Sequence, residues 1–262
     1  MQNFTDSSVP DDGRFVRHRA LTGYTAHPMV VHAILPAAGL GTRMAVPGAS
    51  AKQFLSLGGV PILIHSVRAF VDKANVSTVT VAVRSTEIDH VRAQLVQYGF
   101  GDKVRVVTGG ETRQESVASA LWSLDANDED IVLVHDAVRP LIEPATIERT
   151  IEAIVKHGAA IVGVGAIDTI KLVERTADGA IITGTVPRER VVQAQTPQGA
   201  RFVDLSRAFD EAEVDSFAGT DEASLLERAG ITVAVVQGAA SNLKITQPGD
   251  LELAEFYLNA RR

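Results

Sequence analysis

The residues that decide the fold are VVHAIL at positions 30–35, followed directly by PAAGLGTRM at positions 36–44. The first run is compact and apolar, which is typical of a strand buried on both faces of a sheet. The second run is rich in small residues, and it follows the carboxyl end of the strand, where parallel sheets bind ligands. We therefore predict that the folded part of the chain begins with a buried strand and a ligand-binding loop.

Downstream of this loop, apolar β-branched runs alternate with amphipathic stretches. Further strands are predicted at 78–83, 104–107, 131–135, 160–164 and 232–236. Helices are predicted where apolar residues recur every three or four positions, at 63–73, 88–98, 113–124, 144–157, 203–213, 220–229 and 248–260. Such alternation indicates right-handed crossovers. We expect an α/β fold with a Rossmann-like, mostly parallel sheet and helices on both faces.

The alternation breaks between residues 166 and 195. IKLVE at 170–174 and AIITGTV at 180–186 are joined by Asp178-Gly179, a strong signal for a β-hairpin. A two-stranded ribbon without a covering helix is marginal in water and leaves its edges open. We therefore predict a protruding arm over about residues 166–195 that is covered by a second copy of the chain in a homodimer.

Composition excludes several classes of protein. The chain has 262 residues, a formal net charge of −7 and no cysteine. An acidic chain without a Lys/Arg block is poorly suited to a nucleic-acid backbone, and without cysteine it has no disulfides, cysteine zinc sites, iron–sulfur clusters or thiol nucleophiles. No apolar run approaches the roughly 18 residues that cross a bilayer. We expect no nucleic-acid or membrane partner.

The first 28 residues differ from the remainder of the chain. They carry scattered apolar residues with neither a helical nor a strand period, and they lack a basic-then-apolar signal pattern. We expect residues 1–28 to be a mobile N-terminal extension, residues 29–262 to form one domain, and the location to be cytoplasmic.

The loop after the first strand has the features of a phosphate-binding loop. Small residues at 37–39 and Gly41 allow backbone N–H groups to approach a ligand, and Arg43 and Lys52 supply positive charge. A Walker loop does not fit, because no Gly-Lys-Ser/Thr follows. A dinucleotide fingerprint is weak, because Met44 stands where a third glycine is needed. The alternative is a glycine-rich turn with surface cations.

Three further polar clusters follow predicted strands or precede a helix. GGETRQES at 109–116 is either a ligand loop or simply a capped helix start. HDAVRP at 135–140 places Asp136 where it can meet a metal ion or a ribose hydroxyl, or pair with Arg139 to order the loop. SNLKIT at 241–246 carries Lys244, which is either functional or a solvated surface lysine.

In this order, these segments resemble the 2-C-methyl-D-erythritol 4-phosphate cytidylyltransferases of the non-mevalonate isoprenoid pathway. The matching segments are PAAGLGTRM, AKQF, GGETRQESV, VHDAVRP, DTIK, TVPRERVVQAQTPQ, TDEASLLE and NLKIT with DLELAEFYL. They cover nearly the whole chain from Val30 onward. Cytidylyltransferases for ribitol 5-phosphate share many of these features, so the acceptor alcohol stays open at this point.

The resemblance implies that CTP and methylerythritol 4-phosphate react, with Mg²⁺, to give the CDP-alcohol and pyrophosphate. No general base is required, because a phosphate monoester is already anionic at neutral pH. The family's catalytic cations match Arg43, Lys52 and Lys244. Its nucleotide-binding positions match Ala37, Ala38, Gly39, Gly110, Glu111, Ser116, Asp136 and Ala137, with Asp136 as the expected Mg²⁺ ligand. Its polyol-phosphate positions match Arg139, Thr169, Arg188, Thr196, Thr220 and Lys244, of which Thr169 and Arg188 would enter the neighbouring subunit's site.

Two departures from the family pattern affect these expectations. The loop AVPGASA at 45–51 lacks the proline that many relatives have directly before the lysine matching Lys52. Ser241 stands where relatives often have an acidic residue, so Asp136 and the triphosphate would hold Mg²⁺ without a second carboxylate. A non-catalytic nucleotide-binding protein and a nicotinamide-dependent oxidoreductase are the alternatives from other classes. The first is disfavoured by the retained cations and the second by Met44.

Overall fold

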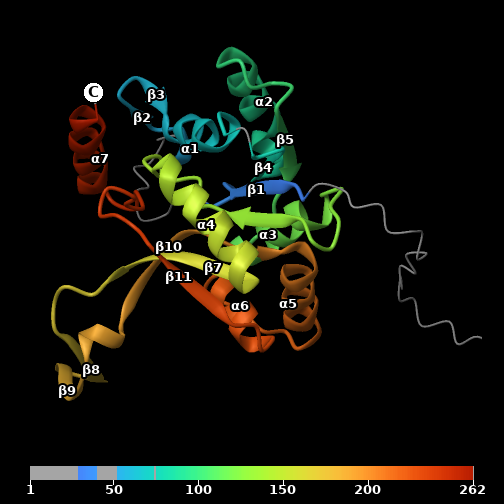
Figure 1. The fold of residues 1–262 in the computed structure, drawn as a ribbon. Helices are drawn as coiled ribbons and strands as arrows, with labels where there is room; N and C mark the ends of the chain where they lie inside the picture. The colour runs from blue at the N-terminus through green and yellow to red at the C-terminus, as the bar shows by residue number, and fades with distance from the viewer. Residues whose placement is uncertain (1–28, 40–51, 74, 262) are drawn as a thin grey trace, which may run out of the picture.

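The computed structural model describes residues 29–39, 52–73 and 75–261, and a seven-stranded sheet forms its centre (Figure 1). The strand order is β11-β7-β10-β6-β1-β4-β5. The strands are β1 (Val31–Pro36), β4 (Thr78–Val83), β5 (Val104–Thr108), β6 (Ile131–Val134), β7 (Ala159–Gly165), β10 (Val192–Arg201) and β11 (Val233–Gln237). Only the pairs that β10 makes with β6 and β7 are antiparallel among these described strands. The expected mostly parallel α/β sheet is confirmed.

Helices cover both faces of this sheet and bury its apolar side chains. One core cluster joins the strands to α1 (Ile62–Val71), α2 (Ile88–Gln97) and α4 (Pro144–His157). The other joins them to α3 (Arg113–Trp122), α5 (Phe202–Val214) and α6 (Glu222–Arg228). Along β1, Ala33 and Leu35 belong to the first cluster and Ile34 to the second, because successive side chains of a strand point to opposite faces. This is why VVHAIL has no polar face.

The last helix and a short ribbon form a third, smaller cluster. α7 (Pro248–Ala260) packs beside β2 (Ser56–Leu57) and β3 (Val60–Pro61), and the cluster includes Leu57, Ile62 and Ile245. Short 3₁₀ helices lie at Lys52–Phe54, Ser85–Glu87 and Arg188–Arg190. The sequence had predicted neither this ribbon nor the 3₁₀ helices. Among the described residues, no helix combines the length and apolar character needed to cross a membrane.

A separate hairpin, β8 (Ile170–Thr176) and β9 (Gly179–Val186), projects away from the sheet (Figure 1). Its turn contains Gly179 at φ +141°, a conformation that glycine adopts without a steric penalty. Leu172, Ile181 and Ile182 are 55%, 62% and 61% exposed on it. The predicted hairpin is confirmed, and within one chain its apolar side chains stay uncovered.

The sequence did not predict β10, the antiparallel strand inside the sheet. Residues 192–195 were expected in the arm, and no strand was expected over 196–201. Its QAQTPQ segment is polar and contains Pro197, which argues against a central strand. The structure accommodates Pro197 where the pairing with β7 shifts register, between Ala194 and Gln198. At Gly199 an added Cβ would lie 2.2 Å from the carbonyl oxygen of Val132, so only glycine fits.

Candidate active site

Loops from four parallel strands meet at the carboxyl edge of the sheet and enclose two adjoining cavities. The first, here the β1–β5 cavity, has a volume of about 280 Å³. The second, here the β10 cavity, has a volume of about 180 Å³. The β1–β5 cavity is lined by residues 36–39, 52–53, 110–113, 116, 136–138 and 244. The β10 cavity is lined by residues 113, 136, 139, 194–196, 198, 220–221 and 244. Arg113, Asp136 and Lys244 belong to both linings.

One part of the wall of the β1–β5 cavity is built from two loops that lie close together. An added Cβ at Gly109 would lie 2.9 Å from Cβ of Ala38 and 2.8 Å from Oγ of Ser116. Gln53, buried behind the loop, donates from Nε2 to the carbonyl oxygen of Ala37 at 2.8 Å. The backbone N–H of Gly110 donates to Oγ of Ser116 at 3.1 Å. These contacts hold the two loops together, so that their main-chain groups can meet a polar ligand in the cavity.

The predicted helix start at α3 is present and contributes to the same wall. Oγ1 of Thr112 accepts from the N–H of Glu115 at 3.1 Å, and Oε2 of Glu115 accepts from the N–H groups of Thr112 and Glu111 at 3.1 and 2.7 Å. This is a capping box. Gly110 and Glu111 line the cavity directly before it. The capped-helix alternative is therefore confirmed, and it does not exclude a binding role.

Asp136 is the centre of a buried cluster of charges. Its Oδ1 lies 3.1 Å from Nε of Arg113, and its Oδ2 lies 3.2 Å from Nε of Arg139 and 3.0 Å from Nζ of Lys244. Burial by itself would raise the pKa of Asp136, but Arg113, Lys244 and Arg139 outweigh it and hold that pKa well below its usual range. With Glu222 paired to Arg113, three cations face two carboxylates. The cluster has a net positive charge, as an anionic ligand requires.

A neutral histidine and a threonine position Asp136. Nε2 of His135 lies 3.0 Å from the carbonyl oxygen of Arg139, which can only accept, so Nε2 carries the proton. Nδ1 therefore accepts from Oγ1 of Thr196 at 3.1 Å, and that oxygen accepts from the N–H of Asp136 at 3.0 Å. Burial lowers the pKa of His135 to about 4, so the ring is neutral at pH 7. Thr196 thus lines the β10 cavity with its hydroxyl engaged in holding the loop.

Lys244 is not a solvated surface lysine. Its segment is fixed by the N–H of Ile245, which donates to the carbonyl oxygen of Val138 at 2.9 Å. Nδ2 of Asn242 donates to the carbonyl oxygen of Thr196 at 2.9 Å. Since the Lys244 side chain is 35% exposed and lines both cavities, its ammonium group can exchange Asp136 for a ligand.

Most of the predicted site residues are brought together here. Those that line one or both cavities are Ala37, Ala38, Gly39, Lys52, Gly110, Glu111, Ser116, Asp136, Ala137, Arg139, Thr196, Thr220 and Lys244. Thr169 and Arg188 lie on the arm and line neither cavity. Arg188 donates to the carbonyl oxygen of Ile167 at 3.0 Å and lies 3.6 Å from Glu189. Arg43, Met44, the 45–51 loop and residues 1–28 lie outside the described residues.

Sequence reasoning did not single out four polar residues that shape the site: Gln53, Arg113, Glu222 and Asn242. Each lies inside a quoted segment, within two positions of a residue that was chosen. Arg113 and Glu222 opened predicted helices, where charged residues are common and need no special role. A signal was nevertheless present for Arg113, because its segment follows the predicted strand at 104–107. What the sequence could not show is that the side chains of Arg113 and Glu222 form an ion pair beside the cavities.

The structure also tests how a metal would be held. Within the described ranges, no group of three or more His, Asp or Glu side chains is arranged to hold a metal ion. Asp136 offers hard carboxylate oxygens that stay ionised, which suits Mg²⁺. The Asp136 carboxylate therefore fits a Mg²⁺ ion that is already bound to phosphate oxygens.

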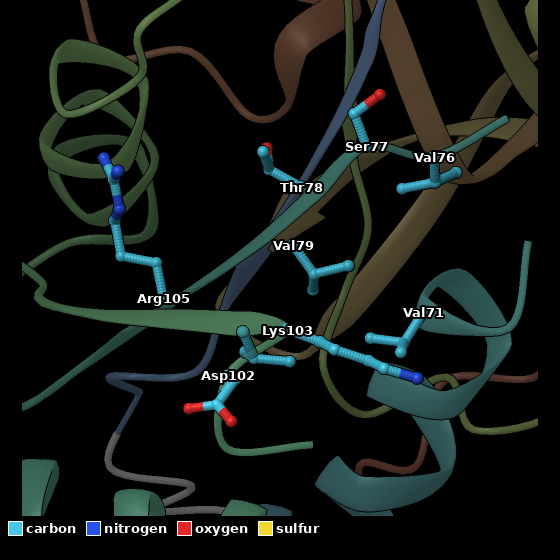
Figure 2. A pocket seen from close by; sticks show the side chains of 9 residues that line it. Val71, Val76, Ser77, Thr78, Val79, Asp102, Lys103 and Arg105 are labelled. Atoms are coloured by element: carbon cyan, nitrogen blue, oxygen red, sulfur yellow. The ribbon is translucent and has the colours of Figure 1, made fainter. Parts of the chain in front are cut away.

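A larger cavity, of about 460 Å³, lies at the amino ends of β4 and β5 (Figure 2). We call it the amino-end cavity; it is lined by Val71, Val76, Ser77, Thr78, Val79, Asp102, Lys103, Val104 and Arg105. In Figure 2 the guanidinium of Arg105 lies apart from the other labelled side chains, and its Nη1 donates to the carbonyl oxygen of Ser123 at 2.6 Å. The charges of this cavity do not converge on one point.

A mostly parallel sheet with glycine-containing loops and a net positive cluster at its carboxyl edge is typical of a nucleotide-binding α/β protein. Comparison with protein families narrows this class. The family model described as "IspD: 2-C-methyl-D-erythritol 4-phosphate cytidylyltransferase" matches residues 31–260. The chain belongs to this family, as its resemblance had implied.

Individual relatives agree with this assignment. The 2-C-methyl-D-erythritol 4-phosphate cytidylyltransferase of Acidobacterium capsulatum is 65% identical over 236 residues, which cover 89% of this chain and 99% of the relative. That of Solibacter usitatus is 48% identical, with 88% and 96% covered. The crystal structure of the Francisella tularensis enzyme of the same name superposes with a TM-score of 0.73 at 33% identity, covering 87% of this chain and 99% of the other.

Proposed function

We propose that this chain transfers CMP from CTP to 2-C-methyl-D-erythritol 4-phosphate, giving 4-diphosphocytidyl-2-C-methyl-D-erythritol and pyrophosphate. The observation that carries the proposal is the net positive cluster around Asp136 at the carboxyl edge, in a chain that belongs to this family. The relatives carry the methylerythritol acceptor in their names. Family membership therefore favours this alcohol over ribitol 5-phosphate.

The β1–β5 cavity is the proposed site of CTP. The backbone at 37–39 and at Gly110 and Glu111 would line the cytosine and the phosphates, because bare main-chain groups can approach both closely. Ser116 holds this wall through its bonds to Gly110 and Thr112. Asp136 and Ala137 also line this cavity, and we expect the ribose and the metal near them.

The chemical step needs positioning and positive charge rather than a base. The acceptor phosphate monoester attacks the α-phosphorus, a new P–O bond forms, and the bond to pyrophosphate breaks with its electron pair leaving on that group. Lys52 and Lys244, together with Arg43 from the part of the chain not described, are proposed to stabilise the charge of the transferring phosphoryl group and of pyrophosphate. Lys244 already lies at the boundary of the two cavities, where the α-phosphorus would be.

We propose that Mg²⁺ binds together with the triphosphate. Bound there, it supplies positive charge for the leaving pyrophosphate. Asp136 would hold it from the protein side, and Lys244 would then move from Asp136 to a phosphate oxygen. Ser241 hydrogen-bonds through its hydroxyl to Arg261 at 3.3 Å and supplies no carboxylate.

The β10 cavity is the proposed site of the polyol phosphate. Arg139, Thr196 and Thr220 line it from the same chain. Thr169 and Arg188 are proposed to reach the neighbouring chain's site in a homodimer that exchanges its arms. The exposed apolar side chains of the hairpin support this proposal, because a partner would cover them.

The test is product analysis with both acceptors. The protein is incubated with CTP, Mg²⁺ and either methylerythritol 4-phosphate or ribitol 5-phosphate. Formation of the CDP-alcohol and of pyrophosphate is followed by ³¹P NMR. We expect both products in equal amounts with methylerythritol 4-phosphate and a rate with ribitol 5-phosphate at least about a hundredfold lower, as a polar site rejects a mismatched substrate. A faster reaction with ribitol 5-phosphate would overturn the assignment of methylerythritol 4-phosphate as the acceptor. The absence of product with either alcohol would overturn the assignment as a transferase.

A further inference from the structure

Arg113 and Glu222 form an ion pair that the roles above leave unused. Arg113 begins α3 and lines both cavities, whereas Glu222 begins α6 and is only 1% exposed. Nη1 and Nη2 of Arg113 donate to Oε1 and Oε2 of Glu222 at 2.7 and 2.9 Å, and Nε donates to Oδ1 of Asp136 at 3.1 Å. One guanidinium therefore joins two buried carboxylates from different parts of the chain.

The pair with Glu222 fixes the plane of this guanidinium. A two-pronged contact sets the orientation of an arginine as well as its distance, which a lysine cannot do. Burial opposes the charged form of Arg113, but Glu222 and then Asp136 raise its pKa above the ordinary value. Arg113 is therefore charged, and its Nε–H donates to Oδ1 of Asp136 in this structure.

Asp136 is held from both sides as a result. Oδ1 is bonded to Arg113, while Oδ2 faces Arg139 and Lys244. We propose that Arg113, fixed by Glu222, is a positioning residue that orients the Asp136 carboxylate and, through it, the ammonium group of Lys244 for the transfer of CMP. This inference rests on the proposed function. It also explains why a buried carboxylate begins α6, directly after the segment that carries Thr220.

The alternative is that the pair only ties α6 to α3, and a double substitution separates the two roles. Arg113→Gln leaves the buried Glu222 without its partner, and Glu222→Gln leaves Arg113 paired with Asp136 alone, so each should lower the melting temperature. Combining Arg113→Gln with Glu222→Gln removes both charges, so much of the melting temperature should return. We expect kcat of the double variant to stay at least about tenfold below wild type, with KM for CTP within about threefold, because orientation and not binding is lost. Recovery of kcat together with the melting temperature would overturn the inference.

Two further variants sharpen this test. Arg113→Lys keeps the charge without the fork, and we expect its kcat to fall about as far as that of the double variant. Arg207 and Glu211 form an exposed pair on α5, and their double glutamine variant should keep wild-type kcat.

Crystal structures separate this inference from the proposed function. If wild-type protein makes no product, the proposed function has failed. The inference is then decided by the double glutamine variant, in which an Asp136 carboxylate turned away from Lys244 supports it. An unchanged Asp136–Lys244 contact in that variant would overturn it.

Discussion

The amino-end cavity and the two cavities at the carboxyl edge lie at opposite ends of the same sheet, and they differ in what their walls carry. The amino-end cavity is the largest of the three, at about 460 Å³ against about 280 and 180 Å³. Its cations, Lys103 and Arg105, come from the start of one edge strand and do not share a carboxylate. At the carboxyl edge, cations from three separate segments converge on Asp136.

The difference follows from strand direction. The carboxyl ends of parallel strands bring loops together that are distant in sequence, so polar side chains from several loops can meet there. At the amino ends of β4 and β5, the wall is made by the ends of α1 and of the strands themselves. We therefore expect convergence of charge, rather than volume, to mark the functional end of this sheet.

The largest expected effect is the loss of a converging cation. Lys52→Ala or Lys244→Ala should lower kcat by at least about a hundredfold, because each removes charge stabilisation from the transition state. Lys103→Ala, in the amino-end cavity, is the matched control and should stay within about twofold of wild type, as surface substitutions usually do. Steady-state rates of pyrophosphate release measure all three. Near-native rates in both site variants would contradict the functional distinction between the two ends of the sheet. An equal loss of rate in Lys103→Ala would contradict it as well.

A second expected effect is the recovery of activity by subunit exchange. Arg188→Ala and Lys52→Ala homodimers should each be nearly inactive, if Arg188 serves the partner's site. In a mixed dimer one site carries both substitutions and the other carries neither, so random exchange should restore about a quarter of wild-type activity.

Native mass spectrometry checks that exchange has occurred before the rate is measured. If mixed dimers have formed and the activity does not rise above that of the two separate variants, the shared site is contradicted. A chain that sediments as a monomer would contradict it as well.

A third, smaller effect concerns stability against pH. The pKa of His135 is lowered to about 4 in the folded protein. The unfolded chain therefore binds more protons between pH 6.5 and 4, and stability should fall as pH falls through this window, by on the order of 3 kcal/mol from this residue. His135→Asn should show a shallower fall, measured by urea unfolding from pH 7 to pH 4.5.

Ser66→Ala is the control for that measurement. Ser66 is a buried hydrogen-bonding residue that does not titrate, and it donates to the carbonyl oxygen of Ala137 at 2.9 Å. It should lower stability by a similar amount at each pH. If His135→Asn has the same pH slope as wild type, the neutral, loop-holding histidine is the wrong description of this site.

The smallest expected effect is that of removing residues 1–28. The family match begins at residue 31, and the Acidobacterium relative is covered over 99% of its own length without most of this segment. A chain that starts at Met29 should keep its melting temperature within about 2 °C and its kcat within about twofold, since changes away from packed or catalytic features are usually small. A larger loss of either would assign these residues a packing or substrate role.

Most of the sheet and its helices could be predicted from the sequence because their signals are local. The strand Thr78–Val83 and the helices Pro144–His157 and Pro248–Ala260 have the predicted bounds, since apolar period and proline at the first turn depend only on neighbours in the chain. β10 was missed because part of its buried surface is polar, with the side chains of Gln195 and Gln198 inside the fold. Gln195 and Gln198 bond to segments around Ala239 and Asp221, which no periodicity reveals.

The candidate site shows the same division. Asp136 and Lys244 were predicted because each lies beside a strand end in a segment that resembles the family. Their contact at 3.0 Å, and the fork of Arg113 on Glu222, depend on which loops the fold brings together. Single sequences carry the residue types of a site but not the pairing of its side chains.

A crystal structure with CTP and Mg²⁺ tests the central claim most directly, namely that the converging charges at the carboxyl edge form the nucleotide site. We predict the cytosine against the backbone of residues 37–39 and 110–111, the triphosphate against Lys52 and Lys244, and the amino-end cavity without nucleotide. Nucleotide bound in the amino-end cavity, or a carboxyl edge without nucleotide at saturating CTP, would contradict the account.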